Sequence, residues 1–152
     1  MPASNLRIAV GSDERTTLTD EVVGYLRRDG HKVDCFGALG DTDSNWPNVA
    51  SEVARRVAAG DVDHGLLFCW TGTGVSIAAN KVPGARAALC ADAQTSLGAR
   101  QWNDANILCM SLRLISFTVA TEIIASWLDA DVDESERENI ETLKAMDSVR
   151  SR

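Results

Sequence analysis

The sequence predicts an α/β protein with a doubly wound (Rossmann-like), five-stranded parallel sheet, helices on both faces and a C-terminal helical tail. Five short apolar runs lie along the chain, and stretches with apolar residues at helical spacing separate them. Parallel strands need crossover connections, which are right-handed, so this alternation indicates a parallel sheet. The 152 residues, 45% of them hydrophobic, fit one domain over residues 1–152, with a C-terminal arm from about residue 130.

The expected elements follow one another in a regular order. Strands are expected at residues 6–11, 31–37, 65–69, 86–90 and 106–110. Apolar residues at helical spacing mark three helix faces: Leu18, Val22 and Leu26; Val49, Val53 and Val57; and Val119, Ile123 and Trp127. Two further helices are expected, one between the third strand and Pro83 and one over residues 92–102.

Glycine and proline mark the helix ends. Gly30 and Gly60 end the first two helices, and Pro47 suits the first turn of the second. The tail is acidic at first and then weakly amphipathic through Ile140, Leu143 and Met146. We expect it either to pack on a partner subunit or to form a frayed terminal helix.

The third strand runs into a glycine-rich turn and then a helix start, in the sequence Cys69-Trp70-Thr71-Gly72-Thr73-Gly74. A turn of this kind leaves backbone N–H groups unpaired and pointing one way, which suits a phosphate, a carboxylate or a developing oxyanion. Ligands on doubly wound sheets bind beyond the carboxyl ends of the strands. Asp13, Cys69, Asp92 and residues 110–111 are expected at that edge.

Cys69 has two interpretations. It stands at the end of the third strand, beside the turn, where a thiolate would be favoured by the positive end of the following helix. A cysteine in a buried strand is also common as a core thiol. The other cysteines, Cys35, Cys90 and Cys109, show no metal or redox spacing, so free thiols are expected.

The overall charge excludes some partners. A net charge of -7 argues against nucleic acid, because phosphate neutralisation needs clustered Lys and Arg. No apolar run approaches the length of a membrane span, and residues 1–5 lack the anatomy of a signal peptide. The sequence therefore predicts a cytoplasmic protein that binds neither nucleic acid nor membrane.

A dinucleotide site is an alternative for the glycine turn. Gly72 and Gly74 match the first two glycines of the fingerprint, and Asp92 lies at the expected distance beyond. The position of the third glycine is occupied by Ile77, however, and the turn lies in the third βα unit rather than the first. Both departures disfavour nicotinamide or flavin binding.

Several motifs closely resemble the ribose-5-phosphate isomerase B family, which includes the galactose-6-phosphate isomerase subunits. The main motif is residues 69–74 followed by Ser76-Ile77-Ala78-Ala79-Asn80-Lys81. Further matches, in the same order along the chain, are residues 11–13, 30–33, 46–47, 84–90 and 103–108. The resemblance therefore covers nearly the whole chain.

The resemblance implies an aldose–ketose isomerase without metal or organic cofactor, with active sites at the interface of a homodimer or a dimer of dimers. Cys69 matches the catalytic thiol, which takes a proton from the carbon beside the carbonyl. The N–H groups of Gly72, Thr73 and Gly74 would hold the enediolate oxygen, and the Thr71 hydroxyl would assist. Asp13 and Asn103 match positions that bind sugar hydroxyls. Each also has a plain structural interpretation, Asp13 as a loop cap and Asn103 as a turn residue.

Two histidines of the family are replaced. The family usually has His after the aspartate of its first loop, where it helps to bind phosphate, and this chain has Glu14. It also has His before Asn-Asp, as the group that opens the furanose ring, and this chain has Trp102. The histidines present, His31 and His64, begin strands, and we expect both to be surface residues away from the ligand edge.

The phosphate-binding tail also departs from the family. Its Gly-Gly-Arg-His segment is replaced here by residues 133–138, in which Arg137 is the remaining arginine. Glu14 would repel a phosphate unless Arg15 or Arg137 offsets its charge. The ring-opening and phosphate groups are therefore altered, whereas the isomerisation residues are kept.

Three functions agree with this pattern. The first is an isomerase of a sugar phosphate too short to form a ring, such as a tetrulose phosphate. The second is an isomerase of a nonphosphorylated or otherwise different polyol, with Trp102 stacked on the sugar. The third is a non-catalytic sugar-binding or partner subunit. The retained Cys69 favours an enzyme.

Overall fold

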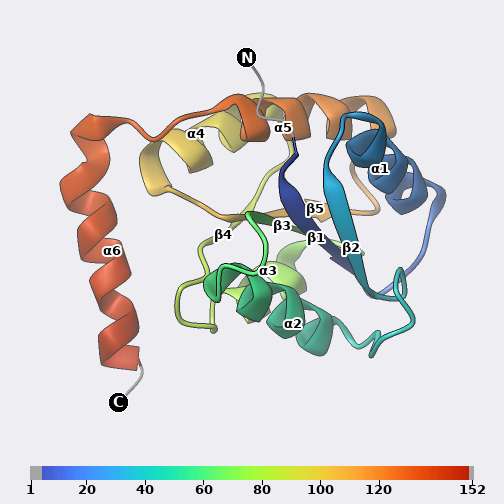
Figure 1. Ribbon diagram of the computed structural model, residues 1–152, viewed down its shortest axis with the longest axis horizontal. Coiled ribbons are helices and arrows are strands. Elements are labelled where there is room, and N and C mark those ends of the chain that lie inside the picture. The colour runs from blue at the N-terminus through green and yellow to red at the C-terminus, as the bar shows by residue number, and fades with distance from the viewer. Residues whose placement is uncertain (1–4, 151–152) are drawn as a thin grey trace.

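The computed structural model describes residues 5–150, with side chains up to residue 148, so the expectation about a signal peptide falls almost wholly outside them. The elements in chain order are β1 (Arg7–Ser12), α1 (Thr17–Arg28), β2 (Lys32–Gly37), α2 (Trp46–Ala58), β3 (His64–Cys69), α3 (Thr73–Ala79), β4 (Ala87–Leu89), α4 (Ala93–Asn103), β5 (Ile107–Ser111), α5 (Phe117–Asp129), η1 (Glu134–Glu136) and α6 (Arg137–Arg150). The strands form one parallel sheet in the order β2-β1-β3-β5-β4 (Figure 1). The predicted α/β fold is therefore confirmed.

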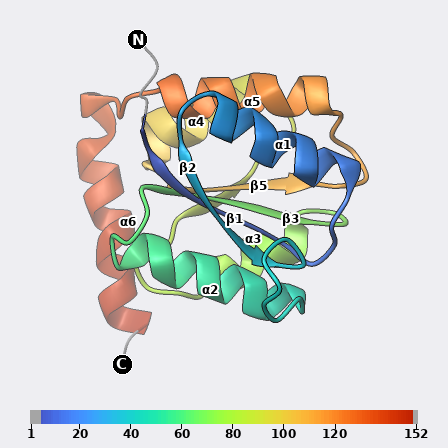
Figure 2. The same cartoon turned by 45° about the vertical axis from the view of Figure 1, so that its right-hand side comes forward.

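The sheet lies between two helix layers. Helices α1, α4 and α5 cover one face, and α2 and α3 cover the other (Figures 1 and 2). Side chains alternate along β3, so Leu66 and Phe68 pack in the first core, whereas Leu67 and Cys69 pack in the second. Burial on both sides explains why the central strands are continuous apolar runs.

The two edge strands differ from the central ones. β2 carries the exposed side chains of Lys32 and Asp34 in its first half. β4 spans only three residues, although residues 86–90 were predicted as strand. Short or charged edges limit pairing with other chains. No helix within residues 5–150 is long and apolar enough to cross a membrane.

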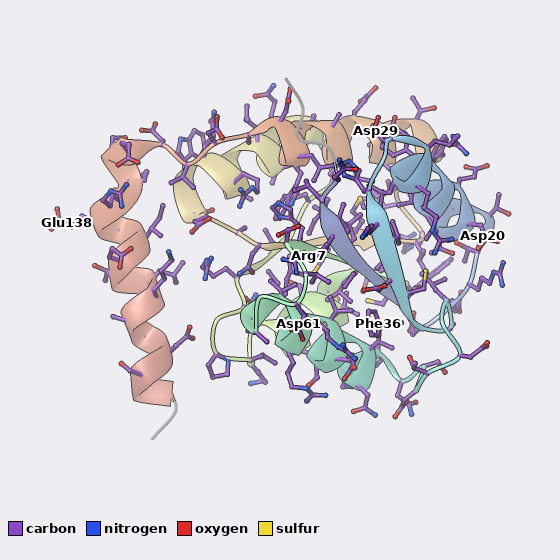
Figure 3. The ribbon with its side chains drawn as sticks, viewed as in Figure 1. Arg7, Asp20, Asp29, Phe36, Asp61 and Glu138 are labelled. Carbon is purple, nitrogen blue, oxygen red and sulfur yellow. The ribbon has the colours of Figure 1, made fainter. Side chains whose placement is uncertain are left out.

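The tail forms a helix that stands beside the main body. Figure 1 shows α6 apart from the two layers, and Glu138 points away from the body (Figure 3). Ile140 is buried, whereas Leu143 and Met146 remain 40% and 54% exposed. The tail thus contributes little to the chain's own core.

The prediction that both histidines lie at the surface is wrong. His31 is buried, and its Nδ1 accepts the backbone N–H of Leu6 at 3.2 Å. His64 is partly buried, and its Nδ1 accepts the indole N–H of Trp127 at 3.2 Å. Both donors are distant in sequence. Each provides a hydrogen bond to an imidazole nitrogen that is shielded from water.

The buried His64 predicts a stability that depends on pH. Burial lowers the pKa of His64 to about 4, and the nearby charge of Arg100 acts in the same direction. The unfolded chain takes up the proton near the ordinary pKa of 6.5, so the unfolded state gains stability first as the pH falls. The stabilisation by neutral His64 is complete above pH 6.5 and is lost toward pH 4, by roughly 3 kcal/mol.

Urea unfolding of wild type and His64→Gln at pH 7 and pH 4.5 tests this expectation. The glutamine does not titrate, and its amide oxygen can accept the Trp127 N–H. Wild type should lose more stability than the variant between the two pH values. Equal losses would show that His64 does not carry the dependence.

Candidate active site

The turn after β3 is held in a narrow space. Gly72, the N-cap of α3, has φ +77°, a conformation that glycine adopts without strain. A Cβ atom there would lie 2.6 Å from Leu89 Cδ1 and 3.0 Å from the carbonyl carbon of Met110. Glycine is therefore required both for its conformation and for space.

The neighbouring strand fixes the same turn by hydrogen bonds. The Ser111 hydroxyl donates to the carbonyl of Trp70 at 2.9 Å, and the N–H of Leu112 donates to the carbonyl of Cys69 at 3.0 Å. The Thr71 and Thr73 hydroxyl oxygens lie 2.7 Å apart and share a hydrogen bond. No side chain caps α3, so its first N–H groups have no capping partner from a side chain.

A cavity of about 280 Å³ opens at this turn. Its lining comes from the ends of β1 and β3 and the starts of α2 and α3: Asp13, Trp46, Cys69, Trp70, Thr71, Thr73 and Gly74. Five of the residues expected to act together share this one cavity: Asp13, Cys69, Thr71, Thr73 and Gly74. The location agrees with the carboxyl edge predicted for a ligand.

Asp13 carries an unmatched polar atom at this cavity. Its Oδ1 is buried and has no hydrogen-bond partner among the described residues. Burial raises the pKa of the Asp13 carboxyl, and the charge of Glu14 adds to the rise. A buried acceptor without a partner is suited to a ligand hydroxyl.

Cys69 agrees with both interpretations, since it is a core thiol and also borders the candidate site. It is 5% exposed and packs in the core beneath α2 and α3, and it also lines the cavity. Cys35, Cys90 and Cys109 line no part of this cavity and are free thiols, as is Cys69. Within residues 5–150, no group of three or more His, Cys, Asp or Glu is arranged to hold a metal ion.

Trp46 was not predicted as a site residue. It begins α2, is 44% exposed and lies against the turn, where a Cβ added to Gly74 would be 3.0 Å from Trp46 Cε3. In the sequence, Trp46-Pro47 served as a helix start and as a motif of the family resemblance, but Trp46 was assigned no role at the site. An aromatic residue that opens a helix at the ligand edge is the signal that would have identified it.

Glu14 and Arg15 follow Asp13 but do not line the cavity. Glu14 is exposed, and its backbone N–H donates to Ser12 Oγ at 3.2 Å. Arg15 Nε donates to Asp20, labelled in Figure 3, at 2.9 Å. The Arg15 side chain lines a separate cavity beside α1.

Trp102 and Asn103 lie at the other edge of the sheet. They end α4, which begins after the carboxyl end of β4 and returns to the amino end of β5. Both line a 480 Å³ cavity that contains none of the residues around Cys69. The Trp102 indole lies over Gly98, where an added Cβ would be 2.8 Å from Cζ3.

Arg137 is also absent from the Cys69 cavity of its own chain. It begins α6 and binds the carboxylate of Glu134 through two hydrogen bonds, of 2.8 and 2.7 Å. This pairing raises the pKa of Arg137 further. Within one chain, Trp102 and Asn103 therefore lie together away from Cys69, and Glu14, Arg15 and Arg137 line neither cavity.

Comparisons with known proteins cover nearly all of the chain. A family model described as ribose/galactose isomerase matches residues 8–144. Ribose-5-phosphate isomerase B of Escherichia coli (strain K12) is 35% identical over 147 residues, 95% of this chain and 99% of that protein. D-erythrulose-4-phosphate isomerase of Pectobacterium atrosepticum is 37% identical over 131 residues, 84% of this chain and 86% of that protein. The solved ribose-5-phosphate isomerase B of Clostridium thermocellum has a TM-score of 0.87 at 33% identity, covering 94% of this chain and 98% of that one.

Fold and sequence together define an α/β enzyme that isomerises sugars. The chain belongs to the ribose/galactose isomerase family and is a sugar-phosphate isomerase of the ribose-5-phosphate isomerase B type. The predicted family and the predicted class of enzyme, an aldose–ketose isomerase, are confirmed.

Proposed function

We propose that the protein interconverts a four-carbon aldose phosphate and ketose phosphate, by proton transfer through an enediolate and without a metal or organic cofactor. The observation that carries this proposal is the cavity in which Cys69, Asp13 and the turn of residues 71–74 come together. A relative that acts on D-erythrulose 4-phosphate supports the choice of a four-carbon substrate.

The proposed mechanism assigns a role to each group. The Cys69 thiolate removes the proton from the carbon beside the carbonyl and returns it to the neighbouring carbon, while the hydroxyl proton passes from one enediolate oxygen to the other. The N–H groups of Gly72, Thr73 and Gly74 stabilise the charge on the enediolate oxygen, and the Thr71 hydroxyl assists. The buried carboxylate of Asp13 accepts hydrogen bonds from substrate hydroxyls. Trp46, opposite this group, forms an apolar wall.

We further propose that a second copy of the chain completes the site. Trp102, Asn103 and Arg137 do not line the Cys69 cavity of their own chain. Around the turn, an apolar surface remains exposed, formed by Trp70, Ile77, Leu89 and Leu114. Exposed apolar residues in such a group favour a contact between subunits, so a homodimer or a dimer of dimers is expected.

One observation favours a nonphosphorylated substrate instead. The two arginines expected to offset the charge of Glu14 near a phosphate are paired with carboxylates, Arg15 with Asp20 and Arg137 with Glu134. Both pairs are exposed and therefore weak, so a phosphate can displace either carboxylate. Comparison of phosphorylated and free tetroses distinguishes the two substrates.

Removal of the thiol tests the catalytic role of Cys69. Cys69→Ala should lower kcat by about 10²–10⁴-fold, the usual contribution of a positioned base, and leave circular dichroism and oligomeric state unchanged. Cys35→Ala, at a half-buried thiol of β2, should alter stability more than rate. An active Cys69→Ala protein would remove the basis of the mechanism.

The indole at position 102 predicts a preference for short substrates. The Trp102 N–H is a donor only, so it cannot take the proton of an anomeric hydroxyl and open a furanose ring. A tetrulose phosphate cannot close that ring through its phosphorylated oxygen. We expect a markedly higher kcat/KM for tetrulose phosphate than for ribose 5-phosphate, and a gain on ribose 5-phosphate in Trp102→His. Faster turnover of ribose 5-phosphate than of every four-carbon substrate by wild type would contradict this prediction.

Subunit exchange tests the shared site. Cys69→Ala and Asn103→Ala proteins should each have little activity, whereas a mixture that exchanges subunits should recover up to about a quarter of wild-type activity, because each hybrid dimer has one intact site. A mixture of two Cys69→Ala preparations is the control. No recovery, or a monomer near 16.4 kDa in light scattering, would show that the site lies within one chain.

A further inference from the structure

One carboxylate, that of Asp104, binds cations from three separate elements. Arg86, just before β4, lies 3.4 Å from Oδ2, and Arg100 in α4 lies 3.4 Å from Oδ1. Lys144 in α6 lies 3.3 Å from Oδ2. No other carboxylate among the described residues forms ion pairs with three different cations. The exposed fractions of the side chains are only 23% for Asp104, 18% for Arg86 and 14% for Arg100.

The backbone of Asp104 is fixed as firmly as its carboxylate. Asp104 is the C-cap of α4 with φ +48°, and its N–H donates to the carbonyl of Ala99. Its own carbonyl accepts Arg86 Nε at 2.6 Å. Burial lowers the pKa of Arg100, and the charge of Asp104 opposes this shift, so the guanidinium depends on the carboxylate for compensation.

These contacts join α6 to the end of α4. Lys144 is the α6 cation that reaches Asp104, and Asp147, one turn later, accepts the N–H of Gly84 at 2.8 Å. Asn103 is the residue directly before Asp104, and Arg137 begins the helix that Lys144 anchors. Helix α6 stands beside the body (Figures 1 and 2), and these polar contacts hold it there together with the buried side chain of Ile140.

We propose that Asp104 is a positioning residue, which holds α6 and the end of α4 as one rigid unit and so presents Asn103 and Arg137 together to the active site of the neighbouring subunit. The catalytic part of this inference rests on the proposed function. Asp104 itself contacts no reacting atom, so its loss changes substrate binding more than proton transfer. Displacement of binding groups by a fraction of an ångström is enough to weaken a site.

Two substitutions separate the carboxylate from the backbone of Asp104. Asp104→Asn and Asp104→Gly both tolerate the positive φ, and both remove the charge. We expect KM for the tetrulose phosphate to rise about tenfold in each, with kcat within about twofold of wild type. Lys144→Met, which releases α6 alone, should raise KM less and add little to Asp104→Asn in the double variant. Glu141→Gln removes the other carboxylate near Lys144, at 3.9 Å, and should leave KM unchanged.

A second readout is independent of activity. Tryptic cleavage after Arg137 should be several-fold faster in Asp104→Asn, Asp104→Gly and Lys144→Met than in wild type or Glu141→Gln, because α6 opens more often. Wild-type KM and cleavage rate in Asp104→Gly would overturn the proposal, since a backbone role alone is satisfied by glycine. Wild type that turned over no four- to six-carbon sugar or sugar phosphate would overturn the proposed function instead, and the cleavage rates would still decide whether Asp104 holds α6.

Discussion

The passage of the backbone through Gly72 is the constraint on which the cavity depends. Leu89 at the end of β4 and the backbone of Met110 in β5 leave no room for a side chain at this residue. The chain therefore leaves the sheet in one direction, with the carbonyls of Cys69 and Trp70 hydrogen-bonded to Ser111, Leu112 and Arg113 at the end of β5. Cys69 and α3 take their places from this turn.

The parallel sheet also divides the candidate residues into two groups. Helices return to the amino edge before each new strand, so residues at helix C-termini lie opposite those in the loops that follow strands. Asp13 and Cys69 belong to the carboxyl edge, whereas Asn103 belongs to the amino edge. A site that uses both groups would need two chains. In such a dimer, the attachment of α6 through Asp104 would position residues for the neighbouring subunit, a role that it could not have in a monomer.

Much of the fold was predictable from the sequence, because strands buried on both faces are continuous apolar runs and helices carry apolar stripes. β4 was predicted too long. Residues 86–90 are apolar enough for a longer strand, but β4 lies at the edge of the sheet and only Ala87–Leu89 form the strand. The burial of His31 and His64 was not predicted, because their hydrogen-bond partners, Leu6 and Trp127, are distant from them in the sequence. No local pattern reveals such a contact.

The candidate site was predictable to a smaller extent. The motif predicted the grouping of Asp13, Cys69 and the glycine turn, and the cavity contains them. Trp46 was missed because a tryptophan before proline also has an ordinary role at a helix start. The separation of Asn103 from Cys69 follows from topology, but its meaning depends on a second chain, which one sequence cannot describe.

The burial of Cys69 has a consequence for the durability of the protein. Thiolates are oxidised in steps to sulfenic and then to irreversible sulfinic and sulfonic acids, and susceptibility follows exposure. With 5% of its surface exposed, Cys69 can be reached by an oxidant from the cavity that we propose as the substrate site. A bound sugar would therefore shield the thiol while it is in use, and oxidative loss would fall mainly on molecules that are idle.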